Sequence, residues 1–328
     1  MMSRSRISAA ASVAAHELPM DLFQLETFLA VVQERSFSRA AQKLHRTQPA
    51  ISQIVRKLEG DIGEPLFDRS SRDGTLTDAG RVLHDYAQRL LNLRTQAQGA
   101  LRELRQFQKG KLSVAANEFT CLYLLRVLDE YRHLHPMISV AVQRAFARKI
   151  PDEIMNRNVE LGVLAYDPDD PLLRSIVVYR DELAFVLHPG HPLARPRDNA
   201  RELSIRQLGA ESFIAHNVPS SYRAKVLQAF KRHRTPLNMD VELPTLEAIK
   251  KFVAMKNGVA LVPGIAVEAE LARGELVQVP VRELRFERKL RIVYRKNASL
   301  SHAARAFLNV AQDVAATRGG RYCFKQEK

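Results

Sequence analysis

One stretch of this chain predicts a helix with an apolar side and an acid-free polar side: Thr47-Gln48-Pro49-Ala50-Ile51-Ser52-Gln53-Ile54-Val55-Arg56-Lys57-Leu58-Glu59. Thr47 is suited to cap this helix, and Pro49 falls in the first turn, where its missing N–H costs nothing. At roughly 100° per residue, one half of the helix gathers Ala50, Ile51, Ile54, Val55 and Leu58. The other half gathers Gln48, Pro49, Ser52, Gln53, Arg56 and Lys57.

The polar half suits duplex DNA because it offers donors, acceptors and two cations. An acid there would be repelled by phosphates, whereas Gln, Ser and Arg can reach base edges or phosphate oxygens in a major groove. An ordinary solvated helix face is the alternative. What lies on either side of the stretch decides between these interpretations.

Two short helices are predicted ahead of this stretch. Residues 22–33 place Leu22, Leu25, Phe28, Leu29 and Val32 on one face. Asp21 and Gln24 are spaced as a capping box at the start of that helix. Ser36 can cap a second helix, Phe37 to His45, whose small alanines allow close packing. Three helices in this order predict a helix-turn-helix.

A strand, a turn with Gly74 and a second strand are predicted over residues 68–77, and they would form a wing. Arg69 and Arg72 lie in this segment, where they can meet phosphates or a minor groove. Ordinary surface arginines are the alternative for these two.

The chain resembles the LysR-type transcriptional regulators over about 60 residues. The matching runs are Ser36-Phe37-Ser38-Arg39-Ala40-Ala41, Thr47-Gln48-Pro49-Ala50-Ile51-Ser52, Leu58-Glu59, Pro65-Leu66-Phe67-Asp68-Arg69 and Leu76-Thr77-Asp78-Ala79-Gly80. The resemblance implies an N-terminal winged helix-turn-helix over residues 20–77 that binds double-stranded DNA. Together with the helix face and the wing, it makes the candidate DNA-binding residues Ser36, Arg39, Thr47, Gln48, Pro49, Ser52, Gln53, Arg56, Arg69 and Arg72.

A long linker helix is predicted over residues 78–108. Its apolar residues recur at steps of three and four: Val82, Tyr86, Leu90, Leu93, Ala97, Ala100, Leu104 and Phe107. Such a stripe needs a partner to cover it. The resemblance implies a second subunit, hence a homodimer or homotetramer that reads two half-sites of an imperfect palindromic operator. Packing on its own chain is the alternative.

Strands alternate with helices in the remaining two-thirds of the chain, which predicts parallel sheets in an α/β domain. The fold class is therefore α plus α/β. The resemblance implies an effector-binding domain over residues 109–312 that is similar to periplasmic binding proteins. Its subdomain I is expected at 111–180 and 281–312 and its subdomain II at 181–280. Residues 1–19 are interpreted as a disordered extension and residues 313–328 as a polar tail.

A cleft between two such subdomains lies at strand carboxyl ends and helix N-termini, which favour anions. The candidate effector-binding residues are Asn117, Glu118, Thr120, Phe146, His216, Asn217, Ser220 and Ser221. Glu118 favours an amine-bearing or zwitterionic effector. Residues 111–328 contain 34 Lys and Arg but 24 Asp and Glu. This positive excess favours an anionic effector, or else it serves only to keep the protein soluble. The chain also has Arg144-Ala145 where the family often has an acid–Gly pair.

Composition argues against several other classes. The net charge of +14 is compatible with a polyanion partner, but most of the excess lies outside the DNA-binding segment. No apolar run of about 18 residues predicts a membrane span, and two cysteines suggest a reducing compartment, the cytoplasm. Catalytic motifs, metal sites and cofactors are not expected; His188 and His191 are interpreted as a surface loop. The start of a helix would lower the pKa of Cys121, although a structural thiol is the favoured alternative.

The sequence thus predicts a DNA-binding transcriptional regulator, not an enzyme, that a small-molecule effector controls through the cleft. One alternative is a constitutive regulator with no effector. Another is an enzyme or solute-binding protein with an incidental helical appendage.

Overall fold

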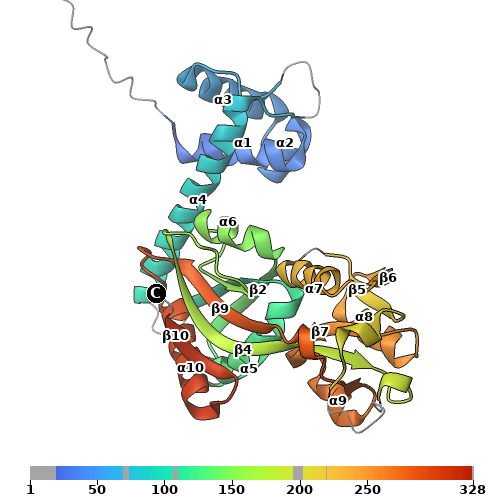
Figure 1. The fold of residues 1–328 in the computed structure, drawn as a ribbon. Helices are drawn as coiled ribbons and strands as arrows, with labels where there is room; N and C mark the ends of the chain where they lie inside the picture. The colour runs from blue at the N-terminus through green and yellow to red at the C-terminus, as the bar shows by residue number, and fades with distance from the viewer. Residues whose placement is uncertain (1–19, 69–73, 106–109, 195–201, 219, 327–328) are drawn as a thin grey trace, which may run out of the picture. The chain divides into compact units, whose positions relative to one another are not determined.

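The computed structural model describes residues 20–68, 74–105, 110–194, 202–218 and 220–326 (Figure 1). The chain divides into two compact units, Met1–Thr95 and Gln96–Lys328. The expected N-terminal extension, residues 1–19, lies outside the described residues.

The first unit begins with three helices, α1 (Leu22–Glu34), α2 (Phe37–Lys43) and α3 (Gln48–Ile62). The predicted capping box of Asp21 and Gln24 is confirmed at the start of α1. The predicted apolar half of α3 is also confirmed, because Ile51, Val55 and Leu58 are buried in the core that the helices share. Burial of this face against α1 and α2 holds the helix-turn-helix together.

A short antiparallel pairing follows α3. Phe67 and Leu76 form an isolated β-bridge, so the base of the predicted wing is a single bridge rather than two full strands. The Glu59 carboxylate accepts the backbone N–H of Leu66 at 2.8 Å and that of Phe67 at 3.3 Å, which ties the bridge to α3. The predicted wing residues Arg69 and Arg72 lie outside the described residues.

The long helix α4 spans Asp78–Arg105. The Thr77 hydroxyl accepts the N–H of Gly80 at 3.0 Å and donates to the carbonyl of Pro65 at 2.6 Å, so it anchors the start of α4 beside the bridge. The side of α4 that the sequence predicts to need a partner includes exposed apolar side chains: Val82, Tyr86, Leu90 and Leu93.

The second unit contains a sheet in the order β10-β4-β9-β3-β1-β2. These strands are β1 (Gly110–Ala116), β2 (Ile138–Arg144), β3 (Leu161–Leu164), β4 (Leu173–Leu187), β9 (Glu287–Arg295) and β10 (Tyr322–Gln326). The expectation of parallel sheets is only partly right. β1 is parallel to β2 and β3, whereas β4, β9 and β10 pair antiparallel, because the chain crosses between the subdomains in both directions.

The two crossings are β4 and β9, which run side by side (Figure 1). β4 pairs with β9 as far as Glu182 and then with β7 (Ala260–Pro263) and β8 (Val277–Gln278) in subdomain II. The expected start of the return to subdomain I, residue 281, is too early. Val281 and Leu284 pack in the core of subdomain II, so the return begins with β9.

Helices cover the sheets of both subdomains. Subdomain I has α5 (Glu118–Leu134), α6 (Ile150–Met155) and α10 (His302–Arg318), and Tyr131 of α5 packs edge-on against Phe307 of α10 in its core. Subdomain II has a parallel pair, β5 (Ser212–His216) and β6 (Asn238–Leu243). Its helices are α7 (Ser221–Arg232), α8 (Leu246–Ala254) and α9 (Glu268–Arg273).

The interpretation of residues 313–328 as a polar tail is wrong for the described part. Residues 313–318 complete α10, and after Gly319 and Gly320, both with positive φ, the chain returns as β10 along β4. The Tyr322 ring packs edge-on against Tyr179, with ring centroids 4.9 Å apart. Pairing and aromatic packing therefore hold this segment on the sheet.

Candidate nucleic-acid interface and ligand cavity

The polar face of α3 is open to solvent. Gln48, Pro49, Gln53 and Arg56 are exposed, Ser52 is half-buried, and the Gln48 amide donates to the Ser52 hydroxyl at 2.9 Å. From Thr47 to Lys57 the sequence has no acid, so nothing on this part of the helix repels a phosphate backbone.

The other candidate residues have structural roles at the ends of helices. The Ser36 hydroxyl accepts the N–H of Arg39 at the start of α2. The Arg39 guanidinium donates to the carbonyl of Glu34, the last residue of α1, with Nε at 3.1 Å. Thr47 stands at the N-cap of α3 but makes no side-chain capping hydrogen bond, so its predicted capping role is limited to the position.

A cavity of about 860 Å³ lies between the two subdomains of the second unit. It is bounded by the ends of β1, β2 and β3 on one side and by β5, α7 and α8 on the other. Six of the candidate effector-binding residues line it: Asn117, Glu118, Phe146, His216, Asn217 and Ser220. The carboxyl ends of strands and the starts of helices therefore meet here, as the sequence predicts.

One candidate residue, Thr120, is placed differently. Thr120 is buried and donates its hydroxyl to the carbonyl of Val163 at 3.1 Å, so it faces the core rather than the cavity. It is the partner of Asn117 in a capping box, and the Asn-x-x-Thr spacing is the signal that predicts this orientation. Ser221 is the first residue of α7.

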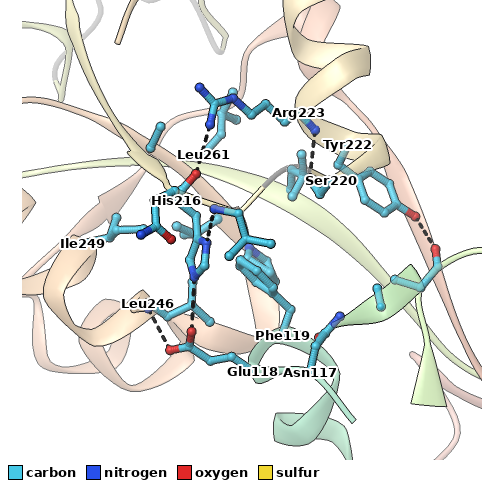
Figure 2. Close-up of a pocket in the computed structure, with 18 of the residues that line it drawn as sticks. Asn117, Glu118, Phe119, His216, Ser220, Tyr222, Arg223, Leu246, Ile249 and Leu261 are labelled. Atoms are coloured by element: carbon cyan, nitrogen blue, oxygen red, sulfur yellow. Dashed lines mark hydrogen bonds and ion pairs between the residues drawn. The ribbon is translucent and has the colours of Figure 1, made fainter. Parts of the chain in front are cut away.

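Glu118 spans the cavity (Figure 2). It begins α5 in subdomain I, and its carboxylate accepts the backbone N–H of Leu246 in subdomain II at 2.8 Å. Its second oxygen lies 3.3 Å from Nε2 of His216. The one acid among the described residues that line the cavity is thus already engaged with hydrogen-bond donors.

Four arginines line the cavity and were not among the candidate residues: Arg144, Arg148, Arg223 and Arg288. Arg223 pairs with Glu242 and donates to the carbonyl of His216 at 3.1 Å. Within the described part of the chain, Arg144 and Arg148 have no ion-pair partner, and both are exposed. Arg144 is the residue that stands where the family often has an acid, and this departure is the available signal.

A second connection across the cavity runs through Tyr222. Its hydroxyl donates to the carbonyl of Ala165 in subdomain I at 2.9 Å (Figure 2). The guanidinium of Arg288 lies over the Tyr222 ring, 5.4 Å from its centroid. Arg288 belongs to β9, so this stack links α7 to one of the crossing strands.

The histidine and cysteine candidates have local structural roles. His188 and His191 each accept a backbone N–H two residues ahead, from Gly190 and Leu193, which shapes their loop. Burial raises the pKa of the Cys121 thiol, so the helix start does not lower it. The described residues contain no group of three His, Cys, Asp or Glu placed to hold a metal ion, and none of their helices is long and apolar enough to cross a membrane.

The helix-turn-helix has a third helix whose polar face is open and carries no acid from Gln48 to Lys57. Joined to a two-subdomain α/β unit with a cavity, it defines a ligand-responsive DNA-binding regulator. Residues 22–81 match the model of the bacterial regulatory helix-turn-helix protein, lysR family, and residues 105–316 match the LysR substrate binding domain. The chain belongs to the LysR family of transcriptional regulators and is not an enzyme.

Relatives of similar length support this assignment. A probable RuBisCO transcriptional regulator of Synechocystis is 32% identical over 299 residues, which is 89% of this chain and 86% of the relative. A protein of the same description from Gracilaria tenuistipitata is 32% identical, over 89% of this chain and 95% of the relative.

Solved structures share the fold. CbnR complexed with its target DNA superposes with a TM-score of 0.68 at 18% identity, over 90% of this chain and 99% of CbnR. A full-length OxyR variant of Pseudomonas aeruginosa gives 0.67 at 24% identity, over 94% and 99% of the two chains. The CcmR regulatory domain of Synechocystis in complex with 2-PG gives 0.57 at 24% identity, over 63% and 97%. The predicted fold class is confirmed.

Proposed function

We propose that this protein binds an imperfect palindromic operator as a homodimer or homotetramer and that an anionic small molecule in the cavity modulates this binding. Support for the DNA-binding residues comes from the open polar face of α3. Support for an oligomer comes from the exposed apolar side chains of α4, which need a covering surface. A chromosomal operator supports the proposal that the protein acts in the cytoplasm.

The anionic class of effector rests on Arg144 and Arg148. Both line the cavity without an ion-pair partner among the described residues, whereas Glu118 is satisfied by Leu246 and His216. Two uncompensated guanidinium groups attract carboxylates and phosphates through charge-assisted hydrogen bonds. This balance disfavours the amine-bearing effector that Glu118 alone suggests. CcmR, of the same fold, was solved with 2-PG, which makes 2-PG a suitable probe.

Effector binding is tested by titrating inorganic phosphate and 2-PG calorimetrically into the wild type and into the double variant Arg144→Gln, Arg148→Gln. Losing two charge-assisted contacts weakens binding by at least about tenfold. Arg132→Gln, on the exposed side of α5, removes a cation elsewhere and leaves binding unchanged. Equal affinity in the double variant and the wild type contradicts the proposed site.

DNA binding is tested on an operator selected from random duplexes. The double variant Gln48→Ala, Arg56→Ala loses affinity by about 10²-fold or more, because a base-edge contact and a phosphate contact are removed. The slope of the logarithm of affinity against the logarithm of salt concentration becomes shallower by about one, because one phosphate contact is lost. Arg132→Ala serves as the control, and circular dichroism checks folding. Unchanged affinity in a folded double variant contradicts the assignment of α3. If no small molecule changes the footprint, the constitutive regulator is favoured instead.

A further inference from the structure

The Glu118 carboxylate occupies hydrogen-bond donors of the opposite subdomain. Oε1 accepts the N–H of Leu246, the first residue of α8, at 2.8 Å, and Oε2 lies 3.3 Å from Nε2 of His216. Glu118 itself is part of α5, in subdomain I. The side chain of Glu118 therefore connects the two halves of the cavity, as the hydroxyl of Tyr222 also does (Figure 2).

His216 is prepared to donate to this carboxylate. Its Nδ1 accepts the backbone N–H of Val218 at 3.0 Å, so the proton of a neutral ring resides on Nε2, which faces Glu118. The Phe119 ring packs against the imidazole with ring centroids 4.9 Å apart, and the side chain is only 11% exposed. The orientation of this donor is thus held by its surroundings.

The start of α8 supplies the second donor. The Thr245 hydroxyl caps the helix by accepting the N–H of Ala248 at 3.2 Å, which leaves the N–H of Leu246 directed at Glu118. The positive end of the helix favours a negative charge at this point. Glu118 therefore supplies, from within the protein, the kind of group that an anionic ligand would bring.

We propose that Glu118 is an internal counter-anion that holds the subdomains together in the ligand-free protein and competes with an anionic effector for His216 and the N–H of Leu246. This inference rests on the proposed anionic effector. An effector drawn in by Arg144 and Arg148 meets the like charge of Glu118 at these donors and must displace it. Displacement frees the contact between α5 and α8 and so couples cavity occupancy to the arrangement of the subdomains.

The competition is tested with Glu118→Gln in the full-length protein. The amide keeps the size of the side chain and can still accept the N–H of Leu246, but it carries no charge and its NH₂ group would oppose the Nε2–H of His216. Inorganic phosphate and 2-PG, titrated calorimetrically, bind the variant about tenfold more tightly than the wild type, because a nearby like charge is removed. Glu130→Gln, on the exposed side of the same helix, leaves the affinity unchanged.

The contact itself is tested without any ligand. Hydrogen exchange of the peptide around Leu246 becomes faster in Glu118→Ala than in the wild type and stays unchanged in Glu130→Ala. Equal exchange in Glu118→Ala and wild type overturns the inference, whatever the titrations show.

The titrations separate the two proposals. If the wild type binds phosphate or 2-PG and Glu118→Gln binds it equally or more weakly, the inference is overturned while the anionic effector stands. If the wild type binds neither probe and Glu118→Gln binds one, the inference is supported in its strongest form. If neither protein binds, the anionic effector and the competition are both rejected, and the exchange of Leu246 still decides whether Glu118 joins the subdomains.

Discussion

Arg288 and Asp181 form an ion pair directly opposite each other on the two crossing strands, with the guanidinium 2.9 Å from the carboxylate. The side chains are 3% and 0% exposed. Burial raises the pKa of Asp181 and lowers that of Arg288, while the attraction between them opposes both shifts. Arg288 also lines the cavity. The pair therefore joins the wall of the cavity to the two strands that cross between the subdomains.

Arg288→Met is expected to destabilise the protein by about 3 to 5 kcal/mol, since it removes the buried cation beside Asp181 and leaves only the exposed Arg321, 3.8 Å away. Urea unfolding followed by circular dichroism measures this loss. Arg180→Met is the matched control, because the Arg180–Glu287 pair joins the same strands but is exposed, and its loss costs less than about 1 kcal/mol. Adding Asp181→Leu to Arg288→Met recovers much of the loss. Similar costs for the two single arginine variants would contradict the role of the buried pair.

Gly80→Ala is expected to destabilise the first unit by about 2 kcal/mol or more, because a Cβ there would lie 2.1 Å from the carbonyl oxygen of Leu66. Gly60→Ala on α3 is the control. A Cβ at Gly60 meets nothing within 4 Å, so this substitution stabilises the helix by up to about 1 kcal/mol. Thermal unfolding distinguishes the two, and a neutral Gly80→Ala would show that α4 does not pack closely on the bridge.

Glu283 is expected to make subdomain II sensitive to acid. Burial alone would raise the pKa of Glu283, but hydrogen bonds from the N–H of Ile205 at 2.9 Å and the hydroxyl of Ser204 at 3.2 Å outweigh it and hold the pKa below its ordinary 4.5. The ionised Glu283 carboxylate therefore contributes its full stabilisation above about pH 4.5, the ordinary pKa, which also applies to the unfolded chain. This stabilisation is lost as the pH falls through the lower pKa of the folded state. Glu283→Gln flattens the acid side of a plot of melting temperature against pH, whereas Glu130→Gln preserves it. An unchanged acid side in Glu283→Gln would argue against these bonds.

Cys121 is expected to react slowly with alkylating reagents at neutral pH. Because burial raises its pKa above the ordinary 9.0, the thiolate that reacts is scarce in the folded protein. Iodoacetamide labelling of a Cys323→Ser background, followed by mass spectrometry, measures Cys121 alone, and the urea-unfolded protein provides the reference rate. Labelling as fast as in the unfolded protein would restore the reactive thiol as a hypothesis.

The sequence predicts the helix-turn-helix well because its signals are local. Asp21 and Gln24 stand three residues apart, and the burial of Ile51, Val55 and Leu58 follows from helical periodicity alone. The crossing strand β4 lacks such a signal. It is buried on both faces over Ile176–Tyr179 and again over Ala184–Leu187, because its two ends belong to different subdomains, and it shows no regular alternation.

The parts of the site that the sequence misses depend on distant contacts. Arg288 lines the cavity only because β9 crosses beside β4, and no local pattern distinguishes it from the other arginines of a basic chain. The same reasoning applies to β10, whose pairing partners lie more than 140 residues away along the chain. By contrast, Glu118 lies two residues after β1 and His216 ends β5, and the carboxyl ends of strands are where the sequence predicts the cleft.

β4 lies between two hydrogen-bonded neighbours, β9 on one side and β10 on the other. A ribbon of this kind strongly resists sliding, which would break every N–H···O=C bond of the ladder, but it yields to torsion, which preserves them. We therefore expect a change in the arrangement of the subdomains to twist this ribbon rather than to slide its strands past one another. Because β10 pairs with β4 between Ile176 and Tyr179, a change in the twist of β4 would have to be followed by this last strand as well.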